Sequence, residues 1–243
     1  MKLSEKTVHD IIVLLKQIIK FAVSKKYIEY FDFNVSQPKV KNKELAILSK
    51  YEHSKLINYI QLTFDINKIG VLLSLFMGVR IGEVCALKWE DVNFQTETLR
   101  INKTMQRIKN LDEKAITKTK IVIDTPKSQK SIREIPIPSF IVNLMKKYKT
   151  DKEKYLLTGT AEFIEPRVYQ DMFKTYLKES GIEDINYHAL RHTFATRAIE
   201  QDFDIKSLSE ILGHSSVKFT LERYVHPSEE HKRKNMEKMS VFY

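Results

Sequence analysis

Two histidines and two arginines lie within the ten residues from His188 to Arg197, which read HALRHTFATR. Cations this close together repel one another, so we expect an anionic partner between them. A metal ion is one alternative, because His188 and His192 have the spacing of zinc-binding histidines on a helix. However, Ala189 stands where the zinc pattern needs a glutamate, and Arg191 would repel a divalent cation. A phosphate fits better, because the arginine fork matches its oxygens in pairs.

Three other segments contain a polar residue with both a structural and a chemical interpretation. Arg80 lies in the otherwise apolar run MGVRIGEV, where Glu83 is its simplest salt-bridge partner. Lys127 lies in TPKSQKSIREIP, between two predicted strands, where a solvated turn lysine is the ordinary interpretation. His214 and Tyr224 flank a short predicted helix in ILGHSSVKFTLERYVH, where amphipathic packing explains the tyrosine. None of these residues identifies a site alone.

The spacing in the first segment predicts which side chains share a helix face. His188 and Arg191 are three residues apart and therefore face the same way. His192 lies four residues after His188, so it either shares that face or packs against the core, and we favour the core.

With these residues the sequence resembles the tyrosine recombinases, or phage integrases, and especially integrases of conjugative transposons and phages of Gram-positive bacteria. The motifs that carry the resemblance are GVRIGEVCALKWEDV, TPKSQKSIREIPIP, HALRHTFAT, LGHSS and ERYVH, which follow the family's order. The match covers residues 49–226 well and the N-terminal segment more loosely. The site residues that it implies are Arg80, Lys127, His188, Arg191, His214 and Tyr224.

The resemblance implies a role for each of these residues in cutting and rejoining DNA. Arg80 and Arg191 would clamp the scissile phosphate, and His214 would donate to the same oxygens. Tyr224 would attack the phosphorus and form a 3′-phosphotyrosine. The resemblance also implies that Lys127 and His188 transfer protons.

Lys127 would protonate the leaving 5′-oxygen, and His188 would take the proton from the tyrosine. One phosphodiester replaces another of similar energy, so we expect no cofactor, no ATP and no metal ion. The sequence agrees, because it contains no Walker loop and no metal-binding cluster of cysteines and histidines.

Charge and composition agree with a nucleic-acid partner. The chain has 41 Lys and Arg against 31 Asp and Glu, a formal net charge of +10. We therefore expect double-stranded DNA as partner, contacted mainly through its phosphates. By resemblance, we also expect assembly into a synaptic tetramer on two duplexes, with accessory DNA-bending or excisionase proteins.

Other features predict the compartment. The single cysteine, Cys85, excludes an intramolecular disulfide framework and is typical of a reducing compartment. No signal-peptide pattern opens the sequence, and its most apolar run, residues 69–79, is too short to span a bilayer. We therefore expect a cytoplasmic protein without membrane contact, associated with the nucleoid when bound to DNA.

The elements that must position these residues are mostly helical. Apolar residues recur at helical spacing in residues 3–28, after a plausible N-cap at Ser4. Ser49 and Glu52 form a capping-box signature, INKIGVLLSLFMGVRIGEVCALKW predicts one apolar helix, and Gly213 predicts a helix end. Between Thr98 and Ile137, short β-like runs predict a small antiparallel sheet. The predicted fold class is mainly α with a small antiparallel β-sheet.

These elements and the resemblance predict a domain order. Residues 1–41 would be the last helices of a helical core-binding domain, 42–48 a linker, and 49–243 the catalytic domain. We expect the chain to be a fragment or to have an internal start. Its tail, residues 229–243, is expected to form a short helix that docks its apolar end on a catalytic domain.

Two other functions remain open from the sequence, besides a metal-dependent nuclease that EDTA would inhibit. A type IB topoisomerase shares the chemistry but reseals one duplex as a monomer. A catalytically silent DNA-binding regulator would tolerate the loss of Tyr224 or of either arginine, and this sequence has lost none of them.

Overall fold

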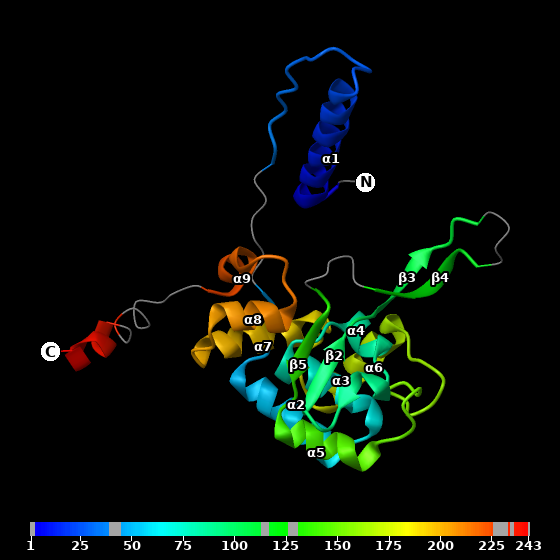
Figure 1. Ribbon diagram of the computed structural model, residues 1–243, viewed down its shortest axis with the longest axis vertical. Coiled ribbons are helices and arrows are strands. Elements are labelled where there is room, and N and C mark those ends of the chain that lie inside the picture. The colour runs from blue at the N-terminus through cyan, green and yellow to red at the C-terminus, as the bar shows by residue number, and fades with distance from the viewer. Residues whose placement is uncertain are drawn as a thin grey trace. The chain divides into compact units, whose positions relative to one another are not determined.

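The structure, a computed structural model, describes residues 3–38, 45–112, 117–125, 131–225, 233 and 236–242 (Figure 1). The chain divides into two compact units, Met1–Glu44 and Leu45–Tyr243. We describe each unit by itself. No helix in the described ranges combines the length and the apolar character that crossing a membrane requires.

The first unit contains one described helix, α1 (Glu5–Ser24). Ser4 caps it as predicted, because its hydroxyl accepts a hydrogen bond from the backbone N–H of Thr7 at 3.1 Å. None of its residues is buried, and side chains of the predicted apolar stripe such as Ile11 and Ile18 are exposed. The assignment of this unit to a core-binding domain stays a prediction.

Helices make up most of the second unit. Its described helices are α2 (Lys50–Leu62), η1 (Ile66–Lys68), α3 (Ile69–Met77), α4 (Ile81–Ala86), η2 (Trp89–Asp91), α5 (Ser139–Tyr148), α6 (Pro166–Glu179), α7 (His188–Glu200), α8 (Ile205–Leu212), α9 (Val217–Tyr224) and η4 (Lys238–Phe242). The predicted capping box is present at α2, where Ser49 and Glu52 bond each other's backbone N–H groups. Gly213 ends α8 with φ 63°, as predicted.

The strands form two small antiparallel sheets. They are β1 (Val92–Asn93), β2 (Thr98–Ile101), β3 (Thr104–Lys109), β4 (Thr119–Asp124) and β5 (Arg133–Pro136). One sheet has the order β1-β2-β5, with Leu99 opposite Ile135, and the other pairs β3 with β4. The predicted fold class, mainly α with a small antiparallel β-sheet, is therefore confirmed, although ETLRINKTM supplies parts of two strands rather than one.

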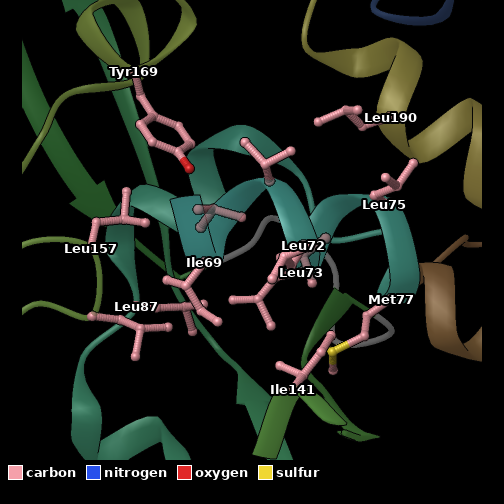
Figure 2. Packing of buried hydrophobic residues seen from close by; sticks show 14 of the residues in the cluster. Ile69, Leu72, Leu73, Leu75, Met77, Leu87, Ile141, Leu157, Tyr169 and Leu190 are labelled. Carbon is pink, nitrogen blue, oxygen red and sulfur yellow. The ribbon is translucent and has the colours of Figure 1, made fainter. Parts of the chain in front are cut away.

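Helix α3 lies in the middle of the core. All but one of its residues are buried, and its side chains pack among Tyr169 of α6, Ile141 of α5 and Leu190 of α7 (Figure 2). Burying one such aliphatic side chain stabilises the fold by roughly 1.5–3 kcal/mol. This rigid centre supports the elements that carry the predicted site.

The long apolar helix predicted between Ile66 and Trp89 is wrong. The chain breaks at Gly78, which adopts φ 66° and ends α3. A Cβ at this position would lie 2.6 Å from Phe194 and 2.7 Å from Leu212, so a glycine suits this place. After the break, α4 begins at Ile81, and Arg80 occupies its N-cap position.

The predicted linker, residues 42–48, is divided by the unit boundary. Leu48 is buried in the second unit, and its backbone N–H donates to the Thr193 hydroxyl at 2.8 Å. Arg197 donates to the Leu48 carbonyl oxygen at 3.1 Å. Leu48 is thus hydrogen-bonded to α7, whereas residues 39–44 lie outside the described residues.

Only part of the predicted tail helix can be compared with the structure. Residues 229–232, 234, 235 and 243 lie outside the described residues. Residues 238–242 form η4, a 3₁₀-helix, and the side chains of Met236 and Met239 are exposed. The docking of this tail on a catalytic domain stays a prediction.

Candidate active site

Arg80 is tied to Glu83 at the start of α4. The backbone N–H and the Nη1 of Arg80 donate to the two carboxylate oxygens of Glu83 at 2.9 and 2.8 Å. The salt bridge that the sequence offered as a simple explanation therefore exists. It leaves the Arg80 side chain 34% exposed, whereas that of Glu83 is only 3% exposed. Arg80 thus keeps an accessible surface for a ligand.

A second arginine, Arg133 of β5, completes the cluster around Glu83. Its Nη1 and Nη2 donate to the same carboxylate at 3.0 and 2.9 Å, and its Nε donates to the Ile211 carbonyl oxygen at 2.6 Å. Burial raises the pKa of Glu83, but hydrogen bonds and charge from Arg133, then the charge of Arg80, lower it to about 2. Arg133 thereby joins β5, α4 and the end of α8.

Arg191 is a buried arginine without a hydrogen-bonded carboxylate among the described residues. It is 2% exposed on α7, and its Nη1 and Nη2 donate to the carbonyl oxygens of Gly78 and Leu212, both at 2.6 Å. Burial and then the nearby charge of Arg80 lower its pKa to about 9, so it remains a cation at neutral pH. A buried cation held only by carbonyl groups is costly, and an anionic ligand would offset that cost.

Tyr224 is the last residue of α9 and is 7% exposed. Its ring stacks on His214, with centroids 6.2 Å apart and planes 2° apart. Its hydroxyl lies 2.9 Å from Nδ1 of His192. Burial raises the pKa of Tyr224, while the charges of Arg191, Arg223 and Arg80 oppose that rise. The three arginines therefore favour the phenolate that a nucleophilic attack needs.

His214 follows the αL glycine that ends α8. Its Nδ1 lies 2.8 Å from the hydroxyl of Thr220. Burial, then the charges of Arg191 and Arg80, lower the pKa of His214 to about 3, so its ring is neutral at pH 7. If Nδ1 accepts from Thr220, the ring proton lies on Nε2, which can donate to a phosphate oxygen.

His188 begins α7 and is anchored through its neighbour. Tyr187 is buried and donates to the Gly70 carbonyl oxygen at 2.7 Å, and it lies 2.8 Å from the Ser74 hydroxyl of α3. The His188 ring makes an edge contact with His192, with centroids 4.5 Å apart. Burial, then Arg191 and Arg80, lower the pKa of His188 to about 4.

The structure brings together five of the six predicted site residues in one electrostatically coupled group: Arg80, His188, Arg191, His214 and Tyr224. The sixth, Lys127, lies outside the described residues. Their catalytic roles stay predictions. Within the described ranges, no three or more His, Cys, Asp and Glu side chains gather as they would around a metal ion.

Sequence reasoning missed two residues of this group. We expected His192 to pack against the core, yet it is half-buried and bonded to Tyr224. Its helical spacing from His188 was the available signal, and it allowed both outcomes. The sequence contained no signal for Arg133, because only the fold shows that β5 brings this residue to Glu83.

Comparisons with known proteins identify relatives of this chain. Residues 47–231 match the Phage integrase family. A "Tyrosine recombinase XerC-like" protein of Caldanaerobacter subterraneus is 33% identical over 172 residues, which cover 64% of this chain and 44% of that protein. The "ICEBs1 integrase" of Bacillus subtilis is 26% identical over 238 residues, covering 92% of this chain and 62% of that one. The chain therefore spans less than two thirds of either relative.

The fold is also similar to that of solved structures. The Tn1549 transposon integrase in complex with transposon right end DNA has a TM-score of 0.76 and 24% identity, covering 98% of this chain and 80% of that one. This likeness concerns the fold. Since the matched residues 47–231 make up more than half of the sequence and include every residue of the site, the chain belongs to the phage integrase family.

Proposed function

We propose that the protein is a site-specific DNA recombinase of the tyrosine type, which integrates and excises a mobile element. One observation carries the proposal: the buried cation Arg191 lies on α7 next to His192, whose Nδ1 is 2.9 Å from the hydroxyl of Tyr224. A cation that needs an anion and a nucleophile that needs an electrophile meet at the same point. A phosphodiester supplies both the anion and the electrophile.

The reaction exchanges one ester of phosphate for another. The oxygen of Tyr224 bonds to the scissile phosphorus, and the bond from phosphorus to the 5′-oxygen breaks. The products are a 3′-phosphotyrosine and a free 5′-hydroxyl, which needs a proton that we assign to Lys127. Attack by a 5′-hydroxyl of another strand reverses the steps and rejoins the DNA. Because the ester bond is conserved, the proposal includes no cofactor, metal ion or ATP.

Three side chains would stabilise the negative charge that develops on the phosphoryl oxygens. Arg80 is partly exposed, Arg191 is fixed by two carbonyl groups, and His214 is held by Thr220. Donors fixed before the reaction need no reorganisation as charge develops, and removing one commonly costs about 100-fold or more in rate.

We further propose double-stranded DNA as the partner, in a synaptic tetramer that joins two duplexes with the help of accessory proteins. The net charge of +10 supports phosphate binding. Relatives named as the "ICEBs1 integrase" and the "Transposase from transposon Tn916" support a role in element transfer. The proposed location is the cytoplasm, on the nucleoid when DNA is bound.

A nicked suicide duplex tests the proposal. Such a substrate loses its short 5′-hydroxyl strand after cleavage, so the covalent protein–DNA adduct accumulates and is read on a denaturing gel. We expect an adduct with the wild-type protein, also in EDTA, and none with Tyr224→Phe, whose binding to DNA stays nearly intact. Tyr51→Phe is the matched control, because Tyr51 is 70% exposed on α2. An adduct with Tyr224→Phe would contradict the assignment.

A further inference from the structure

The hydroxyl of Tyr224 is bonded to a histidine other than the one that the sequence assigned to it. Nδ1 of His192 lies 2.9 Å from this hydroxyl. The ring of His192 is inclined to that of Tyr224, with centroids 5.7 Å apart, so the contact is through the edge atoms. The ring edge of His188 contacts His192.

The direction of this hydrogen bond follows from the neighbours of Tyr224. Burial raises the pKa of Tyr224, but the charges of Arg191, Arg223 and Arg80 lower it and so favour loss of the hydroxyl proton. The hydroxyl therefore needs an acceptor for that proton. Nδ1 of a neutral His192 is such an acceptor.

We propose that His192 accepts the proton of Tyr224 when the tyrosine attacks DNA, an inference that rests on the proposed function. The O–H bond of Tyr224 breaks, and its proton passes to Nδ1 and forms an imidazolium. The oxygen bonds to phosphorus while the bond to the 5′-oxygen breaks, and this leaving oxygen takes its proton from a separate acid. His188 acts through His192, as a positioning residue that fixes the ring by its edge contact.

The charges around His192 keep it in the form that the step requires. On its own helix it contacts His188 and is adjacent in sequence to Arg191, and on α9 it is bonded to Tyr224, the neighbour of Arg223. Burial, then His188, Arg223 and Arg191, lower the pKa of His192 to about 4, so at neutral pH Nδ1 can accept a proton. A bound phosphate would offset the two arginine charges. The basicity of His192 would then increase when the substrate is present.

Single-turnover cleavage of the nicked duplex between pH 5 and 9 tests the inference. His192→Ala removes the acceptor, and we expect cleavage to be slower by about 100-fold or more, with DNA affinity unchanged. Added imidazole should restore part of the rate, in proportion to its neutral fraction, which rises across about pH 6.5. Chemical rescue with this pH dependence distinguishes a proton acceptor from a residue that only supports the fold.

Two other variants complete the experiment. His192→Asn offers an amide oxygen near the position of Nδ1 but no basic group, so we expect wild-type thermal stability with slow cleavage. His53→Asn is the control, because His53 lies on α2 and packs on Phe76. We expect wild-type cleavage from it.

The outcomes separate this inference from the function on which it rests. A wild-type protein that cleaves beside an equally active His192→Ala would overturn the inference alone. Slow His192→Ala cleavage that imidazole does not restore would overturn it as well. The absence of any wild-type adduct would overturn the proposed function and this inference with it.

Discussion

At the scale of single residues, the site contains more arginine charges than carboxylates that pair with them. Glu83 is shared by Arg80 and Arg133, so one carboxylate serves two arginines. Arg191 has only carbonyl partners for its Nη atoms. Burial and then this positive charge lower the pKa values of His188 and His214.

The geometry of Arg191 predicts that charge alone is insufficient at this position. Arg191→Lys keeps a cation but cannot reach the Gly78 and Leu212 carbonyl groups with two nitrogens while still facing a phosphate. We expect both Arg191→Lys and Arg191→Ala to slow adduct formation by about 100-fold or more. Cleavage rates at saturating protein measure this. A lysine variant with the wild-type rate would contradict the role of the fork.

A second residue-scale prediction concerns Lys127, whose assignment rests on resemblance. Lys127→Ala should cleave an ordinary phosphodiester slowly, because the leaving 5′-oxygen then lacks its acid. A substrate with a 5′-bridging phosphorothiolate has a sulfur that leaves without protonation. We expect it to restore the rate of Lys127→Ala, whereas Arg191→Ala should stay slow with both substrates. Equal defects of Lys127→Ala on oxygen and sulfur substrates would exclude it as the acid.

At the scale of elements, the site depends on the ends of short helices and on the contacts between them rather than on long helices. The sequence predicted the caps at Ser49 and Gly213 correctly, because capping is a local property. It did not predict the break at Gly78, because the reason lies in contacts with Phe194 and Leu212 from distant segments. Likewise, an apolar sequence around Arg80 could not reveal the approach of Arg133. Local signals thus located several helix ends, while long-range packing determined how the elements join and how the candidate site residues meet.

The Arg133–Glu83 salt bridge connects β5 to α4, and its loss should lower the free energy of unfolding. Both side chains are buried, at 6% and 3% exposure, so Arg133→Ala should cost about 3 kcal/mol in the free energy of unfolding. The folded pKa of Glu83, about 2, lies below its ordinary value near 4.5. Its contribution is therefore complete above about pH 4.5 and lost as the pH falls toward 2.

Urea unfolding of wild type and Arg133→Ala at a series of pH values measures this contribution. The variant should lose less stability between pH 4.5 and 2 than the wild type does, because Glu83 has lost the arginine that lowers its pKa most. Glu134→Ala, on the same strand with an exposed side chain, is the matched control. Parallel pH curves for wild type and Arg133→Ala would show that the pair does not stabilise the fold.

At the scale of the whole molecule, the proposed function requires that the chemistry of one site be coupled to an exchange between two duplexes. The site itself lies within residues 47–231, which match the family. The segment beyond it ends in an apolar sequence, and the side chains of Met236 and Met239 are exposed there. Exposed apolar side chains favour docking on another surface. By family resemblance, we predict that this surface is the chain's own catalytic domain in the monomer and that of a neighbouring protomer in the synapse.

Deleting residues 229–243 tests this role of the tail. We expect single-site DNA binding to change little, because the residues placed around the phosphate remain. DNA-dependent assembly and adduct formation should both decrease, because Tyr224 lies a few residues before the deletion and its placement would be coupled to docking. Met236→Ser with Met239→Ser should reproduce the assembly defect in a full-length chain, whereas Lys238→Ser should not. Sedimentation of the protein on DNA measures assembly, and a truncated chain that assembles and cleaves normally would remove the tail from the mechanism.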